Sequence, residues 1–292
     1  MWPRGESMKW QGRRGSDNIE DRRGISAGRV AGGGGLGLVA MALIVWALGG
    51  DPMAVLQGAM SGGGGQISSG GGEITPEDQQ AAQFVSVTLA DTEQIWGDIF
   101  KRELGRTYTP TTLVLFKGAT NTSCGGASEA SGPFYCPEDK KVYLDTGFFV
   151  TMAQQLGAKG DFAAAYVVAH EVGHHVQDEL GILDKANAAR QQASEADSNA
   201  ISVRIELQAD CFSGVWARYA ADKLGTLEPG DIQEAVDAAS QIGDDTLQRN
   251  AGRRPTPDSF THGTSEQRQR WLSTGYKAGS SRACDTFGTN TL

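Results

Sequence analysis

Apolar side chains fill almost every position at the start of the segment from residue 161 to 179. After Asp161 the chain reads FAAAYVVA, without the polar face that a surface helix shows. A helix that is apolar all round is buried in the interior of a protein. The pattern therefore predicts a buried helix over residues 161–179.

Other helix starts are indicated by capping residues and proline. Thr75 is followed by Pro76 and then by Glu77 and Asp78, the usual order of an N-cap and a first helical turn. We expect this helix to continue toward Leu104. Further helices are expected over about residues 195–224, after residues 228–230 (Glu-Pro-Gly), and, as a short one, after Gly263.

Strand patterns are confined to the region between these first two helices. Residues 111–117 (TTLVLFK) are β-branched and apolar, and residues 134–136 and 142–144 flank a polar turn at 137–141, as in a hairpin. A small sheet followed by many helices is typical of the α+β class. No internal repeat is evident.

The N-terminal region predicts a membrane anchor. Residues 30–50 (VAGGGGLGLVAMALIVWALGG) contain no charge over 21 positions, enough for a helix to cross a hydrocarbon core of about 30 Å. Seven Lys and Arg residues precede this run, and none follows it until Lys101. This asymmetry predicts a single-pass protein with a cytoplasmic N-terminus and the rest of the chain outside. A cleaved signal peptide is the alternative.

These features divide the chain into four parts. Residues 1–29 form a basic leader, 30–50 the transmembrane helix, 51–74 a Gly-rich flexible linker, and 75–292 the folded domain. The leader is expected to be cytoplasmic and to act as an orientation signal. The domain is expected to be periplasmic or otherwise extracytoplasmic.

Composition and charge exclude some functions. The chain has 292 residues, of which 39% are hydrophobic and 21% charged, which is enough for one well-buried core. Its net charge of −9 argues against nucleic acid as a partner, because phosphate binding needs clustered Lys and Arg. The four cysteines contain no Cys-x-x-Cys pair, so a zinc ribbon or a thioredoxin-like motif is not expected.

The buried helix carries a metal-binding pattern. His170 and His174 are four residues apart, so their rings project from one face and can bind one tetrahedral zinc ion. Glu171 lies beside the first histidine, where it can act as a general base toward a water molecule. Gly173 is costly inside a helix and suggests that another element approaches the backbone there. The alternative is two hydrogen-bonded histidines in a core helix.

A third protein ligand is needed, and residues 206–210 supply the best candidate. A longer histidine motif is excluded, because it would need Gly at 177 and His at 180, where this chain has Gln177 and Leu180. Glu206 and Asp210 are also four residues apart, in a mostly apolar segment. One carboxylate can bind the metal and the other can accept the free N–H of a ligand histidine. A solvated acidic face is the alternative, but buried carboxylates need a cation.

The two remaining histidines are weaker candidates. His175 is rotated by about 100° from His174 on the helix and is expected either to support a ligand or to have a structural role. His262 lies in the segment THGTSEQR, away from the cluster, where a lone loop histidine is more often inert than catalytic.

Several motifs together resemble the bacterial neutral zinc metallopeptidase family. They are AHEVGHHVQ, RIELQADCFSGVWA, GPFYCPEDKKVYLD, THGTSEQRQRWL and KWQGRRGSDNIEDRRG, and the resemblance covers nearly the whole chain. It implies a zincin-like catalytic domain and a single membrane anchor. The expected peptide or protein substrate follows from the predicted peptidase chemistry and not from the family name.

The chain is also similar to gluzincin peptidases with a Glu-x-x-Ala-Asp second motif, such as the HtpX-like membrane peptidases. The similarity implies that His170, His174 and Glu206 bind zinc, that Glu171 is the catalytic base and that Asp210 orients the first histidine. Those relatives carry a further His followed six residues later by Arg. His262 and Arg268 reproduce this spacing, so the similarity implies that His262 stabilises an oxyanion and that Arg268 supports the site.

The chain departs from those membrane peptidases in two ways. They have several membrane helices and a Pro after that histidine, whereas this chain has one apolar run and Gly263. Substrate entry from the bilayer is therefore not implied.

A zinc-dependent peptidase is the predicted function. The alternatives are a binding or chaperone-like module that keeps the zinc fold, and a zinc amidase that acts on the cell wall.

The cysteines allow three disulfide pairings. Cys124 and Cys136 bracket a Gly-rich loop and the hairpin, and Cys211 and Cys284 could join the C-terminal tail to the helix that carries Glu206. We favour these two pairs, which require a compartment outside the cytosol.

Overall fold

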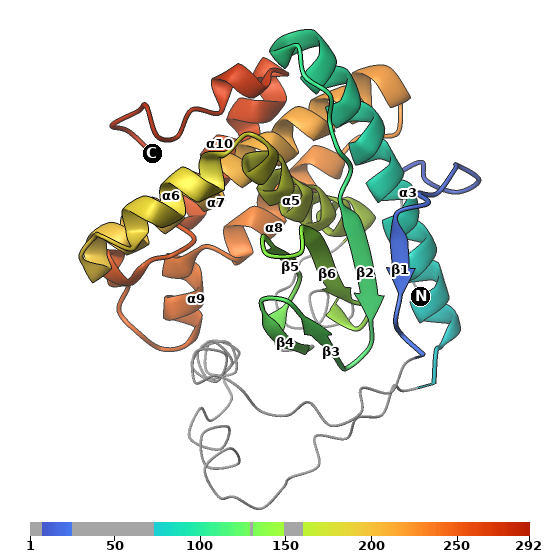
Figure 1. The fold of residues 1–292 in the computed structure, drawn as a ribbon, viewed down its shortest axis with the longest axis horizontal. Coiled ribbons are helices and arrows are strands. Elements are labelled where there is room, and N and C mark those ends of the chain that lie inside the picture. The colour runs from blue at the N-terminus through green and yellow to red at the C-terminus, as the bar shows by residue number, and fades with distance from the viewer. Residues whose placement is uncertain (1–7, 25–72, 129–130, 149–159) are drawn as a thin grey trace, which may run out of the picture.

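The computed structural model describes residues 8–24, 73–128, 131–148 and 160–292 (Figure 1). It is an α+β fold in which a small sheet packs against a larger set of helices. The expected fold class is therefore confirmed. The predicted anchor at residues 30–50 and the linker at 51–74 lie outside the described residues, apart from Glu73 and Ile74. Among the described residues, no helix has the length and apolar character needed to span a membrane.

The main sheet has the strand order β1-β2-β6-β5. Strands β1 (Ile19–Asp21), β2 (Thr112–Phe116) and β6 (Lys141–Asp145) run parallel, and β5 (Phe134–Cys136) pairs antiparallel with β6. The predicted strand and the predicted hairpin are both present. A separate hairpin of β3 (Ala119–Thr122) and β4 (Gly125–Ser128) was not predicted, because its Gly- and Ser-rich sequence lacks the apolar alternation of a strand.

The described part of the basic leader, residues 8–24, is part of the folded unit. Its strand β1 pairs with β2, and the side chains of Met8 and Trp10 are buried in the core. The Trp10 ring meets the Phe84 ring edge to face at 5.5 Å between centroids. In Figure 1 residues 8–24, in blue, lie along the sheet edge beside α3. A domain boundary at residue 75 therefore leaves out residues that the core requires.

The helices follow the predicted order, with additions. Residues 75–104 form α3 (Pro76–Ile99), capped by Thr75, and a π-helical turn η1 (Phe100–Leu104). The buried helix is α5 (Asp161–Glu179). The remaining helical elements are α6 (Ile182–Arg190), α7 (Glu195–Tyr219), η3 (Ala220–Leu224), α8 (Asp231–Gln241), α9 (Asp244–Asn250), η4 (Pro257–Ser259), α10 (Ser265–Ala278) and η5 (Ser281–Ala283).

Glycines allow three helices to pack unusually closely. A Cβ on Gly173 would lie 3.2 Å from the Cα and carbonyl oxygen of Ala209, so α7 approaches the backbone of α5 as predicted. A Cβ on Gly214 would overlap the carbonyl oxygen of Leu272, and one on Gly275 would overlap that of Cys211. The α5–α7–α10 layer therefore depends on these three glycines.

Two disulfides join parts of the fold. Cys124 pairs with Cys136, and Cys211 with Cys284, which are the pairs favoured from the sequence. The second bond fixes the C-terminal tail against α7. Arg204 reinforces it by donating to the carbonyls of Thr286 and Thr289.

Candidate metal centre

Helix α5 presents two imidazoles toward α7. His170 is buried and His174 is half-buried, and their ring centroids are 4.8 Å apart at right angles. The two histidines lie one helical turn apart on the same face of α5. The first half of this helix is apolar all round and is buried in the interior. The rings are therefore fixed by a helix that is itself anchored in the core.

Helix α7 supplies the third candidate ligand. The Glu206 carboxylate is 3.1 Å from Nε2 of His170 and 3.5 Å from Nε2 of His174. The three ligand atoms all lie within 4.8 Å of one another. Ligands of a tetrahedral zinc ion at roughly 2.05 Å are about 3.4 Å apart, so the donor set fits zinc in composition and in spacing.

The charges of the site favour a cation between these side chains. Burial lowers the pKa of His170, but hydrogen bonds to Asp210 and Glu206 outweigh it and raise this pKa to about 10. For Glu206 burial acts in the opposite direction and raises the pKa of the carboxyl group. The charges of His174 and His170 outweigh burial and lower this pKa well below its usual range. Both shifts reflect an ionised carboxylate that is stabilised by positive charge beside it. A bound divalent ion would supply the same positive charge.

Asp210 orients the first histidine. Its Oδ1 accepts from Nδ1 of His170 at 2.9 Å, which leaves Nε2 of that ring facing Glu206. Arg268 donates to both oxygens of Asp210 at 2.9 Å, and the Tyr166 hydroxyl donates to Oδ1 at 2.5 Å. Burial raises the pKa of Asp210, but the Arg268 charge and the His170 hydrogen bond lower it to about 2. The carboxylate therefore stays ionised and fixed in place.

Glu171 is buried next to the candidate ligands. Burial is the main cause that raises the pKa of its carboxyl group above the usual value. A carboxylate with a raised pKa accepts and returns a proton more readily near neutral pH than an exposed one. This environment suits the general base that the sequence predicted.

His262 lies on the loop before α10, close enough to Glu206 for their charges to interact. Its side chain is half exposed, and its Nδ1 is 3.2 Å from Asp244, which also accepts its backbone N–H. Desolvation lowers the pKa of His262, but the Asp244 hydrogen bond and the Glu206 charge raise it. The structure thus brings His262 to the rim of the site.

Several residues of the site were not recognised in the sequence. Gln177 holds His174, Tyr166 holds Asp210, and Asp244 holds His262. Gln177 follows His174 by three residues and Tyr166 precedes His170 by four, so helical spacing places each on the correct face. No local signal indicates Asp244, because it meets His262 from a different element.

His175 is a structural residue, as expected. Its Nε2 is 2.7 Å from the carbonyl of Thr109 and its Nδ1 is 3.2 Å from the Tyr135 hydroxyl. Burial lowers the pKa of His175. The ring is therefore neutral and joins α5 to the sheet.

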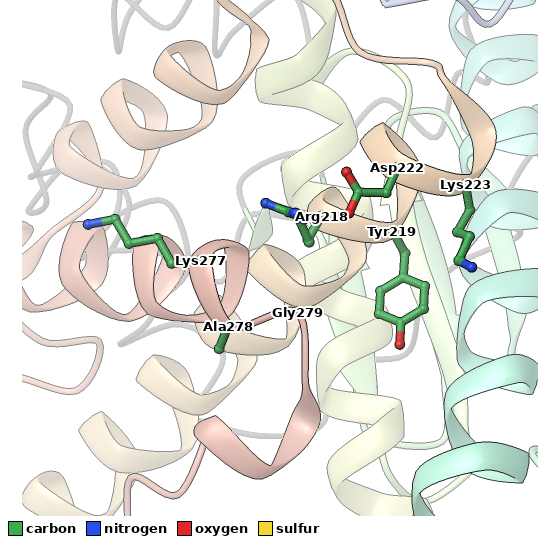
Figure 2. Close-up of a pocket in the computed structure, with 7 residues that line it drawn as sticks. All are labelled: Arg218, Tyr219, Asp222, Lys223, Lys277, Ala278 and Gly279. Atoms are coloured by element: carbon green, nitrogen blue, oxygen red, sulfur yellow. Dashed lines mark hydrogen bonds and ion pairs between the residues drawn. The ribbon is translucent and has the colours of Figure 1, made fainter.

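A pocket of about 250 Å³ lies away from these residues, at the C-terminal ends of α7 and α10 (Figure 2). Its polar lining includes Arg218, Asp222, Lys223 and Lys277, and Arg218 is bound to Asp222. None of its lining residues belongs to the candidate metal centre.

Comparison with known proteins identifies relatives over nearly the whole chain. The family whose sequence model matches residues 8–287 is described as "Putative neutral zinc metallopeptidase". The protein YpfJ of Escherichia coli (strain K12) is 47% identical over 290 positions, covering 96% of this chain and 99% of YpfJ. Protein Rv2575 of Mycobacterium tuberculosis (strain H37Rv) is 46% identical over 195 positions, 63% of this chain and 65% of Rv2575. No solved structure matches the chain.

Proposed function

The chain belongs to the neutral zinc metallopeptidase family, and from this premise we propose that it is a zinc-dependent peptidase. One observation supports this most directly. His170, His174 and Glu206 come from two helices and place their ligand atoms within 4.8 Å of one another, with Glu171 buried beside them. Three protein ligands leave the fourth position of a tetrahedral zinc ion open, as catalytic sites require.

In this proposal each polar side chain has a separate role in hydrolysis. Bound zinc would supply Lewis acidity, lowering the pKa of water and polarising the substrate carbonyl. Glu171 takes the proton from the attacking water and passes it to the leaving amine. His262 donates to the oxygen that becomes negative in the transition state. Asp210 and Arg268 hold His170 in the tautomer that leaves Nε2 free.

A peptide is the substrate class that the surroundings favour. Among the described residues, strand β5 is the terminal strand of the sheet, and its Tyr135 contacts Asp178 of α5 at 2.7 Å. An extended peptide can add to such an edge through main-chain hydrogen bonds. The edge lies beside the helix that carries the candidate ligands, so it can guide a peptide toward them.

Glu171→Gln separates zinc binding from catalysis. We expect this variant of the full-length protein to keep zinc and to lose at least about a hundredfold in turnover, the scale of general base catalysis. His170→Ala is expected to lose zinc. Metal analysis and a peptide-library assay measure both effects. Glu138→Gln, an exposed change on the sheet side, is the matched control. Unchanged cleavage by Glu171→Gln would refute the assigned base.

The same assay separates the alternatives. A binding or chaperone-like module would hold zinc without cleaving any peptide, and a cell-wall amidase would cleave muropeptides in preference to peptides. The buried Glu171 favours hydrolysis over binding alone.

We also propose that the domain works outside the cytosol. Disulfides persist in oxidising compartments, and this fold joins Cys124 to Cys136 and Cys211 to Cys284. Membrane attachment through residues 30–50 stays a prediction.

A further inference from the structure

Gln177 is fully buried between α5 and α7, and every polar atom of its side chain has a partner. Its Oε1 is 2.9 Å from Nδ1 of His174. Its Nε2 is 2.8 Å from the carbonyl oxygen of Ile205 and 3.0 Å from Oε1 of Gln208. Gln177 therefore links a candidate zinc ligand to the facing helix.

The polarity of this network is fixed by two backbone carbonyls. The Ile205 oxygen can only accept, so the Gln177 atom facing it must be the NH₂ group. Gln208 donates its own Nε2 to the carbonyl of Cys284 at 2.8 Å, so its Oε1 is the acceptor for Gln177. Both amide orientations follow from these contacts and not from the shape of the side chains.

The amide orientation determines the tautomer of His174. With its NH₂ group turned to α7, Gln177 presents an oxygen to Nδ1 of His174, and an oxygen can only accept. Nδ1 must therefore carry the proton. In the neutral ring this leaves the lone pair on Nε2, the atom 3.5 Å from Glu206.

We propose that Gln177 is the positioning residue for His174, holding its ring in the tautomer and orientation that bind the metal. The inference rests on the proposed zinc site. It assigns His174 a buried amide in the role that Asp210 has for His170. The two histidines are thus supported by different chemistry, one by a carboxylate and the other by an amide.

Two substitutions separate positioning from packing. Gln177→Glu keeps an acceptor for His174 and, as a carboxylate, cannot donate to Ile205. Gln177→Met has a similar size and can do neither. Both variants lose the contact with α7, so any shared loss of stability reports packing alone. Only the Met variant removes the acceptor for Nδ1.

The tautomer can be read directly from imidazole ¹H–¹⁵N correlation spectra of the full-length protein without zinc. We expect Nδ1–H at His174 in the wild type and in Gln177→Glu, and a mixture with Nε2–H in Gln177→Met. His175, a neutral ring whose Nε2 donates to the carbonyl of Thr109, serves as the internal control and should not change. An unchanged His174 tautomer in the Met variant would overturn the proposal.

Zinc affinity gives the second readout, by chelator competition. Loss of such a supporting hydrogen bond costs about 10–100-fold in metal affinity. We expect that loss in Gln177→Met and near-wild-type affinity in Gln177→Glu. Equal weakening in both variants would mean that Gln177 acts through packing and would refute the positioning role. If the wild type binds no zinc, the proposed function fails, whereas the tautomer result still tests Gln177.

A second inference concerns the leader. Its basic residues suggested a cytoplasmic orientation signal, but Arg13 and Arg23 bond groups of the folded domain. Arg13 binds Asp91 at 2.5 Å, Arg23 donates to the carbonyl of Asp78 at 2.7 Å, and the backbone N–H of Met8 donates to Asp161 at 3.1 Å. These arginines therefore have a structural role that the charge pattern alone cannot reveal.

The described residues on either side of positions 25–72 meet at the same place, the start of α3. Arg23 contacts Asp78 at the start of α3, and Lys117 bonds both the Glu73 carbonyl and the Asp78 carboxylate. A single membrane crossing would put the leader and the domain on opposite sides. We infer that residues 8–24 lie on the same side of the membrane as residues 73–292, in place of the cytoplasmic leader expected from the sequence.

An engineered disulfide tests this arrangement. A Cβ on Gly15 would lie 3.3 Å from Cβ of Ser86, close to the separation in a disulfide. The full-length Gly15→Cys/Ser86→Cys protein is oxidised in intact cells with diamide, which enters all compartments, and mapped by mass spectrometry. We expect a peptide joining residues 15 and 86, absent from both single variants. Free thiols at both positions, with the two native disulfides formed, would overturn the inference.

Discussion

Asp210 joins three other side chains of the candidate centre. It has no exposed surface, and it accepts hydrogen bonds from His170, Tyr166 and Arg268. A buried carboxylate in this position would affect bound zinc only through the histidine that it orients. Its removal should therefore affect both zinc affinity and the stability of the fold.

Asp210→Asn tests both consequences. We expect zinc affinity to fall by about 10–100-fold, because the His170 tautomer is no longer fixed. The free energy of unfolding should fall by about 3–5 kcal/mol, because Arg268 is left buried without its counter-charge. Chelator competition and urea denaturation measure the two effects. Asp258→Asn, at an exposed position, should change neither.

At the scale of elements, close contact between α7 and α10 is the most demanding feature. The backbones approach at Gly214 and Gly275, where any side chain would meet a carbonyl oxygen of the other helix. This contact carries Arg268 of α10 to Asp210 of α7. Packing between the two helices therefore determines the geometry around the first histidine.

Gly214→Ala should destabilise the protein by roughly 1–3 kcal/mol or more, because the added methyl group forces the helices apart. Gly97→Ala is the matched control in α3, where a Cβ would meet nothing within 4 Å. That variant should gain about 0.5–1 kcal/mol from helix propensity. Thermal or urea unfolding measures both changes. Equal effects of the two variants would contradict the close packing of α7 and α10.

The starts of α5 and α8 bring three carboxylates together. Asp161, Asp231 and Glu234 place oxygens within 4.8 Å of one another. Burial and mutual repulsion raise the pKa of Asp231 to about 6 and that of Glu234 to about 7. One oxygen of Glu234 is buried without a hydrogen-bond partner in the described part of the chain.

Raised carboxyl pKa values make this contact less stable as the pH rises. Below the unfolded pKa values, about 4, the groups are protonated in both states and their favourable contribution is complete. This contribution to the free energy of unfolding is lost as the pH rises through the folded-state pKa values of about 6 and 7. Glu234→Gln should therefore match the wild type near pH 4 and be more stable at pH 8. Melting temperatures across this range test the expectation, and a constant difference would contradict it.

For the whole molecule, the leader is the part whose role differs most from its sequence character. It contributes a parallel strand and two buried side chains to a domain that begins about fifty residues later. Residues so distant along the chain pair only when the whole core has formed. The fold should therefore depend on the leader as a unit.

Trp10→Ala should reduce the free energy of unfolding of the full-length protein by about 3–5 kcal/mol, because a buried aromatic ring is replaced by a cavity. Arg14→Ala changes a leader side chain that is 76% exposed and should be close to neutral. Urea denaturation of both variants compares them. A neutral Trp10→Ala would show that the leader does not belong to the core.

The sequence determined the features that depend on local spacing. His170 and His174, and likewise Glu206 and Asp210, share a helical face because they are four residues apart, and apolar neighbours indicated that both faces are buried. Helix caps and strand runs likewise reflect chemistry within a few residues, as at Thr75.

Only the tertiary structure decided which of these faces meet and what supports them. The amide network from Gln177 to Cys284, the Asp244–His262 contact and the strand formed by the leader join residues far apart in sequence. The sequence around a side chain does not indicate a partner that belongs to another element. Such contacts exist only once packing has brought the elements together, which is why the spacing indicated the candidate ligands but not the residues that hold them.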